Sequence, residues 1–273
     1  MEKSKKLRYL AICAHPDDME VAMGGCLWKL ARAGHDVKIV SLTNGDAGHH
    51  QMRPPELAAR RLAEAQKVKT LAGLAEYRIL DIPDGRLEVS LANRDTVIRI
   101  IRELAPHVIF TLRPWDYHPD HRATGQLVQD ASYLMGVPLI CPEMPIPEKR
   151  PVILLTYDEF KQPCGFKADM IVSIDDAIEG KIAMLACHTS QFFEWLPYDR
   201  REMGEVPVTM KAKLAWLKCN FLPSNIRQAD TFRSLLGKRH LKRADSIRHA
   251  ECFELSEYGR RPEPREWDEI LPA

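Results

Sequence analysis

Two short segments rich in histidine and aspartate hold the side chains best suited to chemistry. One reads HPDD at residues 15–18, and the other reads HPDH at residues 118–121. An imidazole and a carboxylate that lie close together in a Pro-containing turn can reach one cation from the same loop. A histidine from a distant loop then completes three protein ligands and leaves a position for water, which is typical of a catalytic zinc site.

The metal ligands that this spacing predicts are His15, Asp18 and His121. Two nitrogen donors and one oxygen donor suit Zn²⁺, and Fe²⁺ also accepts two histidines and one carboxylate. The residue types therefore predict a single catalytic metal ion and leave its identity open between zinc and iron.

The remaining side chains of the two segments are Asp17, His118 and Asp120. Hydrolysis at a zinc site uses such groups, because a carboxylate can remove a proton from water and a second group must protonate the leaving amine. We predict Asp17 as the general base and His118 as the general acid. Asp120 is expected to orient His118 and to stabilise its charge.

The elements that must position these segments alternate between apolar runs and amphipathic stretches. Tyr9 to Ala14 and Val108 to Leu112 are expected as buried strands, each directly before one of the two segments. The alternation predicts an α/β fold with a parallel sheet covered by helices. Such sheets bind ligands beyond the carboxyl ends of their strands, so the two segments are expected to meet there.

The other expected elements follow from hydrophobic periodicity, prolines and glycines. Further strands are expected over residues 37–43, 77–80, 152–156 and 170–174, and helices over 27–33, 56–71, 96–104, 123–135, 176–187, 208–217 and 231–235. Residues 44–53 are expected as a loop. Residues 137–151 carry five prolines and are expected as an extended loop that forms a rim or lid over the crevice or an oligomer contact.

Composition limits the classes of protein to which the segments can belong. The chain has 273 residues, 45% of them hydrophobic, and a net charge of +1, which favours a small or neutral ligand over nucleic acid or an anionic membrane. The basic run at residues 237–248 is interpreted as a solvated helix face. We expect a single domain over residues 1–273, with a catalytic core to about residue 195 and a C-terminal extension over about 196–273.

The cysteines and the N-terminal residues indicate the cellular compartment in which the protein is expected. Seven scattered cysteines form no CxxC pair, which favours a reducing environment over a disulfide framework or a zinc ribbon. The apolar run after the basic start is too short for a signal peptide or a membrane span. The chain is therefore expected to be cytoplasmic.

A family resemblance is visible in the same segments. AHPDDMEVAMGG at residues 14–25, followed by HPDHRATG at 118–125, resembles the LmbE/PIG-L family of zinc-dependent N-acetylglucosaminyl deacetylases. The resemblance implies zinc bound by His15, Asp18 and His121, with Asp17 as base and His118 as acid and stabiliser of the tetrahedral intermediate. It also implies a Rossmann-like three-layer sandwich with a mainly parallel sheet and the metal at the carboxyl end of the strands.

Weaker matches suggest residues near the substrate. The R-x-x-E-A segment that begins at Arg61 and the HTSQ segment that begins at His188 are similar to family segments, as is LDIPDG at residues 80–85. Tyr117 stands where some relatives have an arginine near the substrate. Together with His49 of the loop after the second strand, these residues are the predicted substrate-binding set: Arg61, Tyr117, His188 and His49.

The sequence therefore predicts an enzyme that removes an N-acyl group, most simply acetyl, from an amino sugar or its conjugate. The expected partner is a small N-acetylated sugar, with no nucleic acid and no membrane span, and a homo-oligomer is left open. The nearest alternative is a metallo-amidase that acts on a non-sugar or thiol-conjugate amide, because the catalytic segments do not report the leaving group. More distant alternatives are a metal phosphoesterase and a noncatalytic nucleotide-binding module.

Overall fold

A seven-stranded sheet in the order β3-β2-β1-β4-β5-β7-β6 forms the centre of the molecule. The computed structural model describes residues 6–272. The strands are β1 Arg8–Cys13, β2 Asp36–Ser41, β3 Glu76–Ile79, β4 Val108–Thr111, β5 Val152–Thr156, β6 Met170–Ser173 and β7 Ala250–Leu255. The first five strands are parallel, whereas β7 runs antiparallel to both of its neighbours. The predicted α/β class with a mainly parallel sheet is confirmed.

Helices cover both faces of this sheet and give three layers. The helices are α1 Asp18–Arg32, α2 Pro54–Ala72, α3 Leu91–Leu104, α4 Pro119–Leu134, α5 Ile178–Cys187, α6 Leu196–Asp199, α7 Met210–Thr231, α8 Arg233–His240 and α9 Trp267–Ile270. One buried cluster joins the sheet to α1, α2, α5 and α9, and another joins the opposite face to α3 and α4. Side chains of β1 alternate between the two clusters, so this strand is buried on both sides.

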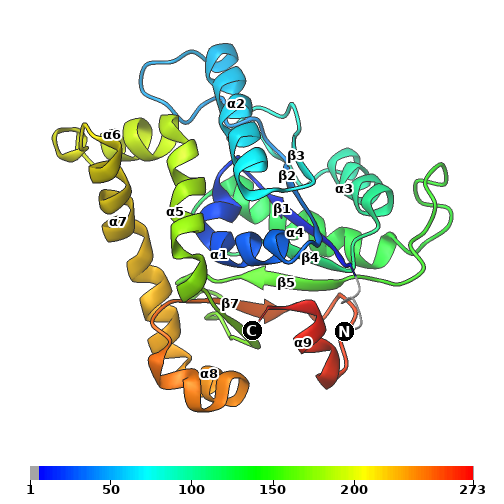
Figure 1. Ribbon diagram of the computed structural model, residues 1–273. Helices are drawn as coiled ribbons and strands as arrows, with labels where there is room; N and C mark the ends of the chain where they lie inside the picture. The colour runs from blue at the N-terminus through cyan, green and yellow to red at the C-terminus, as the bar shows by residue number, and fades with distance from the viewer. Residues whose placement is uncertain (1–5, 273) are drawn as a thin grey trace.

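The residues after 195 complete the same sheet. Strand β7 lies between β5 and β6, with Leu155 opposite Glu254 and Ile171 opposite Cys252. Helix α7 lies beside α5, in yellow and orange in Figure 1, and packs on β7. The expected C-terminal extension is therefore interleaved with the expected core.

The predicted strands agree with the observed ones to within two residues at each end. Residues 231–235, expected as a helix, are helical except for Phe232, where α7 ends and α8 begins. No helix within residues 6–272 has the length and hydropathy of a membrane span.

The Pro-rich loop over residues 137–151 lies beyond α3, in green at the right of Figure 1. The buried guanidinium of Arg102 donates hydrogen bonds to the carbonyls of Met135, Val137, Ile140 and Cys141. These bonds hold the loop on the α3/α4 side of the sheet.

Helix α1 is kinked near its start. Met23 has φ −145° and ψ 26°, which are not helical values, so a first turn over residues 18–22 is separated from the remainder of the helix. The C-terminal end of the helix is regular. The kink matters for the site, because the first turn of α1 follows the HPDD segment directly.

Candidate active site

The HPDD segment forms a tight turn between β1 and α1. Oδ2 of Asp18 accepts hydrogen bonds from the backbone N–H groups of Ala14 (3.1 Å) and His15 (2.8 Å), which closes the turn. Asp17 has φ 144°, a value that non-glycine residues rarely adopt. Such strain is retained where the surrounding structure fixes the residue, and it is common at functional sites.

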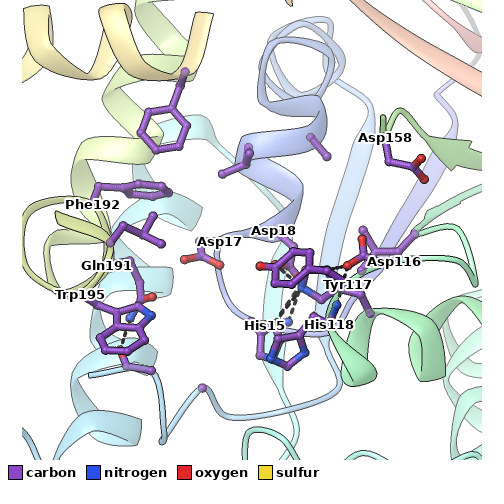
Figure 2. A pocket seen from close by; sticks show the side chains of 18 of the residues that line it. His15, Asp17, Asp18, Asp116, Tyr117, His118, Asp158, Gln191, Phe192 and Trp195 are labelled. Atoms are coloured by element: carbon purple, nitrogen blue, oxygen red, sulfur yellow. Dashed lines mark hydrogen bonds and ion pairs between the residues drawn. The ribbon is translucent and has the colours of Figure 1, made fainter. Parts of the chain in front are cut away.

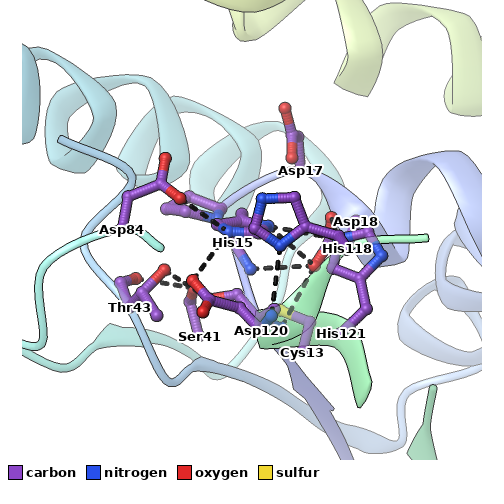
Figure 3. A network of polar contacts seen from close by, with 12 residues as sticks. Cys13, His15, Asp17, Asp18, Ser41, Thr43, Asp84, His118, Asp120 and His121 are labelled. Atoms are coloured by element: carbon purple, nitrogen blue, oxygen red, sulfur yellow. Dashed lines mark hydrogen bonds and ion pairs between the residues drawn. The ribbon is translucent and has the colours of Figure 1, made fainter. Parts of the chain in front are cut away.

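The HPDH segment begins α4, with His118 as the N-cap residue. Because β1 and β4 are adjacent and parallel, the two segments lie at the same edge of the sheet. Nδ1 of His15 is 3.2 Å from Nε2 of His121, which in turn is 3.3 Å from Oδ1 of Asp18 (Figure 3). The structure therefore brings the three predicted metal ligands together.

Carboxylates lie behind both imidazoles. Nε2 of His15 is 3.0 Å from Oδ1 of Asp84 and 3.3 Å from Oδ2 of Asp120. On the other ring, Nδ1 of His121 is 3.0 Å from Oδ1 of Asp116. Histidines that bind metals usually have a carboxylate on the second ring nitrogen, which fixes the ring and makes it a better ligand.

The protonation of the two imidazoles follows from this arrangement. Burial lowers the pKa of His121, but Asp18 and Asp116 more than offset it and raise the pKa to about 10. The pKa of His15 is also raised, because Asp18, Asp120 and Asp84 outweigh its burial. The carboxylates therefore favour positive charge at this point, which either protons or a metal cation can supply.

The donor set fits a divalent metal ion. The facing ligand atoms of His15, Asp18 and His121 are separated by 3.2–3.7 Å, and the second ring nitrogens are occupied by carboxylates. Ligand atoms of His15, His118 and His121 also lie within 4.8 Å of one another, as do those of His15, Asp84 and Asp120. All these groups share His15, so the residues that the structure describes offer one centre rather than independent ones.

The predicted proton carriers border this centre. Oδ2 of Asp17 is 3.2 Å from Nη1 of Arg61, and Nη2 of Arg61 donates a 2.5 Å hydrogen bond to the carbonyl of Pro16. Burial raises the pKa of Asp17, and the charge of Arg61 opposes this rise. Burial also lowers the pKa of His118, and His15 and His121 lower it further. A carboxylate with a raised pKa is a stronger base, and an imidazolium with a lowered pKa is a stronger acid.

The expected role of Asp120 needs a correction. Its buried carboxylate lies against His15 and accepts hydrogen bonds from the backbone N–H groups of Gly85 (2.7 Å) and Leu87 (3.2 Å). Its contact with His118 is through the backbone, because the Asp120 N–H donates to Nδ1 of that ring. The HPDH turn places the Asp120 side chain inward, so it orients His15 instead, while its charge still raises the pKa of His118 as expected.

A cavity of about 810 Å³ opens over the two segments. Asp17, Asp18, Tyr117 and His118 line it (Figure 2). Arg61 lines it as well. Residues from far along the chain also line it, namely Gln191, Phe192 and Trp195 of the π-helix Gln191–Trp195 and Asn220 and Ser224 of α7.

The structure places two of the predicted substrate contacts away from the cavity. His188 is fully buried, does not line the cavity and lies 3.1 Å from Oε1 of Glu20. His49 turns away from the cavity, and its Nε2 lies 3.0 Å from Oε2 of Glu194, so Ala47 and Gly48 present this loop to the cavity. The Pro-rich loop contributes nothing to the lining either, and its expected role as a rim or lid is also wrong.

Sequence reasoning also missed several groups at the site. Asp84 belongs to the LDIPDG segment and Asp116 directly precedes the HPDH turn, but neither position showed which imidazole it would contact. The lining residues of α7 follow no recognised motif. Their position results from the packing of α7 against α5 and β7.

Comparisons with known proteins bear on the family to which this chain belongs. A family model described as "PIG-L: GlcNAc-PI de-N-acetylase" matches residues 10–132. A diacetylchitobiose deacetylase of Thermococcus kodakarensis is 31% identical over 208 residues, which cover 71% of this chain and 75% of that protein. This chain belongs to the PIG-L family. The resemblance seen in the two histidine-aspartate segments is thereby confirmed.

Solved structures extend the PIG-L comparison to almost the whole chain. An N,N'-diacetylchitobiose deacetylase from Pyrococcus horikoshii superposes with a TM-score of 0.68 and 25% identity, covering 92% of this chain and 84% of that one. A 4-carboxy-2-hydroxymuconate hydratase from Pseudomonas putida gives a TM-score of 0.71 at 18% identity, covering 94% and 99%, and shows the fold alone. The named deacetylases are hydrolases that act on amide bonds, which agrees with the predicted enzyme class. Since the same fold is shared with a hydratase, the reaction of this PIG-L member must be argued from its residues.

Proposed function

We propose that this protein is a metal-dependent deacetylase that hydrolyses the N-acetyl amide of an amino sugar or of its conjugate. The observation that carries the proposal is the meeting of the ligand set His15, Asp18 and His121 with Asp17 and His118 in one cavity. The names of the PIG-L relatives support the amino-sugar substrate.

The ligand set suits Zn²⁺, and Fe²⁺ is the alternative. When bound, such an ion lowers the pKa of a water molecule to about 7 and polarises an acyl oxygen. His15 and His121 are held as ligands by Asp84, Asp120 and Asp116.

The chain's own residues then move the protons. Asp17, oriented by Arg61, accepts a proton from the attacking water as a bond forms between the water oxygen and the acyl carbon. The C–N bond breaks, and His118 donates a proton to the departing nitrogen. The products are acetate and a free amine. Tyr117, exposed at the edge of the cavity, is proposed to contact the sugar.

The test measures free-amine release by protein that has been stripped with a chelator and then reloaded with zinc. The substrate panel contains N-acetylglucosamine, an N-acetylated disaccharide, an N-acetylated thiol conjugate and a phosphate monoester. We expect free amine to be released from the two sugars only. We expect the stripped protein to regain this activity when it binds about one zinc ion per chain. The Asp17→Asn variant is expected to lose at least about 100-fold in kcat with unchanged zinc content.

The Asp176→Asn variant is the matched control, because Asp176 is exposed and pairs with Lys29 away from the cavity. Release from the thiol conjugate alone would favour the metallo-amidase alternative. Full activity without metal, or full activity of the Asp17→Asn variant, would overturn the proposed mechanism.

A further inference from the structure

A buried ion pair lies at the kink of α1. Lys181 of α5 and Glu251 of β7 are both fully buried, and Nζ of Lys181 is 2.7 Å from Oε1 of Glu251. Neither residue lines the cavity. A buried ion pair is weak evidence for stability, since its desolvation offsets much of its attraction, so its contacts must explain what it does.

The carboxylate of Glu251 binds the start of the second part of α1. Oε1 accepts a 2.9 Å hydrogen bond from the backbone N–H of Gly25, and Oε2 accepts a 2.7 Å bond from that of Cys26. In a regular helix these N–H groups would donate to the carbonyls of residues 21 and 22. Beyond the kink they are the first N–H groups of a helix, where a carboxylate is favoured by hydrogen bonding and by the helix dipole.

The ammonium group of Lys181 binds the other side of the kink. Its Nζ donates a 2.7 Å hydrogen bond to the carbonyl of Val21, the acceptor that Gly25 would use in a straight helix. This carbonyl ends the first turn of α1, where a cation is favoured. The pair therefore places each charge at the helix end that it complements.

Small residues at the kink allow this arrangement. A Cβ atom at Gly24 would lie 3.1 Å from Cγ of Lys181, and one at Gly25 would lie 2.6 Å from Ile174. Side chains at these positions would force Lys181 or Ile174 away. The paired glycines thus allow α5 and the end of β6 to approach α1.

We infer that Lys181 and Glu251 are positioning residues for the metal site. By binding both sides of the kink, they fix the direction of the first turn of α1, which carries Asp18 and directly follows Asp17. A straight α1 would aim this turn elsewhere and move Asp18 relative to His121. The inference rests on the proposed function, since it assumes that Asp18 binds the metal.

The test compares the zinc affinity of the folded apoprotein, measured by competition with a coloured chelator, with its free energy of unfolding. The Glu251→Gln variant keeps the shape of the side chain. Its amide NH2 group, however, replaces one carboxylate oxygen, so a donor faces the N–H or ammonium donors around it and a hydrogen bond is lost. We expect zinc affinity to fall about 10- to 100-fold, as for other residues that orient ligands indirectly. At saturating zinc we expect kcat to fall with little change in KM.

Arg102→Met is the matched control, because Arg102 is also buried but binds loop carbonyls on the opposite face of the sheet. It is expected to lose stability while its zinc affinity stays within about twofold of wild type. If Glu251→Gln lost stability but kept wild-type zinc affinity and kcat, the pair would be merely structural and the inference would be overturned.

Hydrogen exchange of the wild-type protein gives a readout that does not depend on a variant folding. Because coupling is reciprocal, zinc binding should slow exchange at the amides of Gly25 and Cys26 more than at those of α3. An equal effect at both places would contradict the inference. The Asp18→Ala variant separates the two levels of the argument: unchanged zinc affinity there refutes the proposed metal site, whereas a loss there with none in Glu251→Gln refutes only the positioning role.

Discussion

Arg61 offers the sharpest test of how Asp17, the proposed general base, is held. Its guanidinium is buried and makes two contacts at the HPDD turn, with Oδ2 of Asp17 at 3.2 Å and with the carbonyl of Pro16 at 2.5 Å. The Arg61→Met variant keeps most of the side-chain volume and removes both contacts. Asp17 would then keep its burial and lose the nearest positive charge.

The expected magnitude follows from these contacts. A hydrogen bond that involves a charged group contributes about 1.5–3 kcal/mol. If the contact with Asp17 is used in the transition state to orient the base, its loss lowers kcat/KM about 10- to 150-fold. Loss of both contacts is also expected to lower the free energy of unfolding, by a few kcal/mol at most, because Asp17 borders the cavity and can be hydrated.

The pH dependence of kcat/KM tests the same contact independently, because the direction of its shift can be predicted. Asp17 acts as a base only when deprotonated, so activity is present above its pKa and is lost as the pH falls through it. The charge of Arg61 lowers this pKa, against the larger effect of burial. Removing Arg61 therefore raises the pKa of Asp17 and moves the acid limb of the kcat/KM profile to higher pH.

The matched control for this variant is Arg60→Met. Arg60 is the neighbouring residue on α2, is partly exposed and contacts Glu194 and Glu64 instead of Asp17. The assay is free-amine release across the pH range at saturating zinc, with zinc content measured in parallel. An Arg61→Met enzyme with the wild-type acid limb and kcat/KM, or an Arg60→Met enzyme with the same shift, would refute the reasoning.

Three further predictions concern other parts of the molecule. Asp116→Asn removes the carboxylate behind His121 and should weaken zinc binding about 10- to 100-fold in chelator competition, whereas unchanged affinity would show that this contact does not tune the ligand. The pKa of Asp175 is lowered below its ordinary value, because backbone N–H groups that precede β7 outweigh its burial, so its stabilisation is present above about pH 4 and is lost as the pH falls through the lowered pKa. In the Asp175→Asn variant, the free energy of unfolding measured with urea should depend less on pH in that acidic window. The same pH dependence as in the wild-type protein would contradict this prediction. Trp195 lies across the cavity from His118 (Figure 2), so Trp195→Ala should raise KM for a disaccharide more than for a monosaccharide, and equal effects would exclude a role in binding the larger group.

The sequence predicted the centre of the site well because that part depends on local order. Buried strands ending shortly before HPDD and HPDH place both segments at one edge of a parallel sheet, and β1 and β4 are indeed neighbours. The Asp17 and His118 positions follow from the same two turns. Periodicity also located β1 to β6, since strands buried on both faces are nearly continuous apolar runs, but it missed β7.

The remainder depends on contacts between residues far apart in the chain. His188 and His49 were expected at the substrate, but their partners Glu20 and Glu194 are distant in sequence and draw both rings away from the cavity. The position of the Pro-rich loop depends on Arg102, which lies on another helix. Neither periodicity nor residue type reports such pairings.

The insertion of β7 between β5 and β6 has a consequence for the order of folding. The N–H of Gly25 and the carboxylate of Glu251 are 226 residues apart, and β6 reaches the sheet only through β7. Contacts of such long separation close late, because the loop entropy must be offset before they contribute. The parallel strands β1 to β5 can assemble beforehand, but the kink of α1 is capped only when β7 docks. The geometry of the proposed metal site is therefore expected to be among the last features that the folding chain acquires.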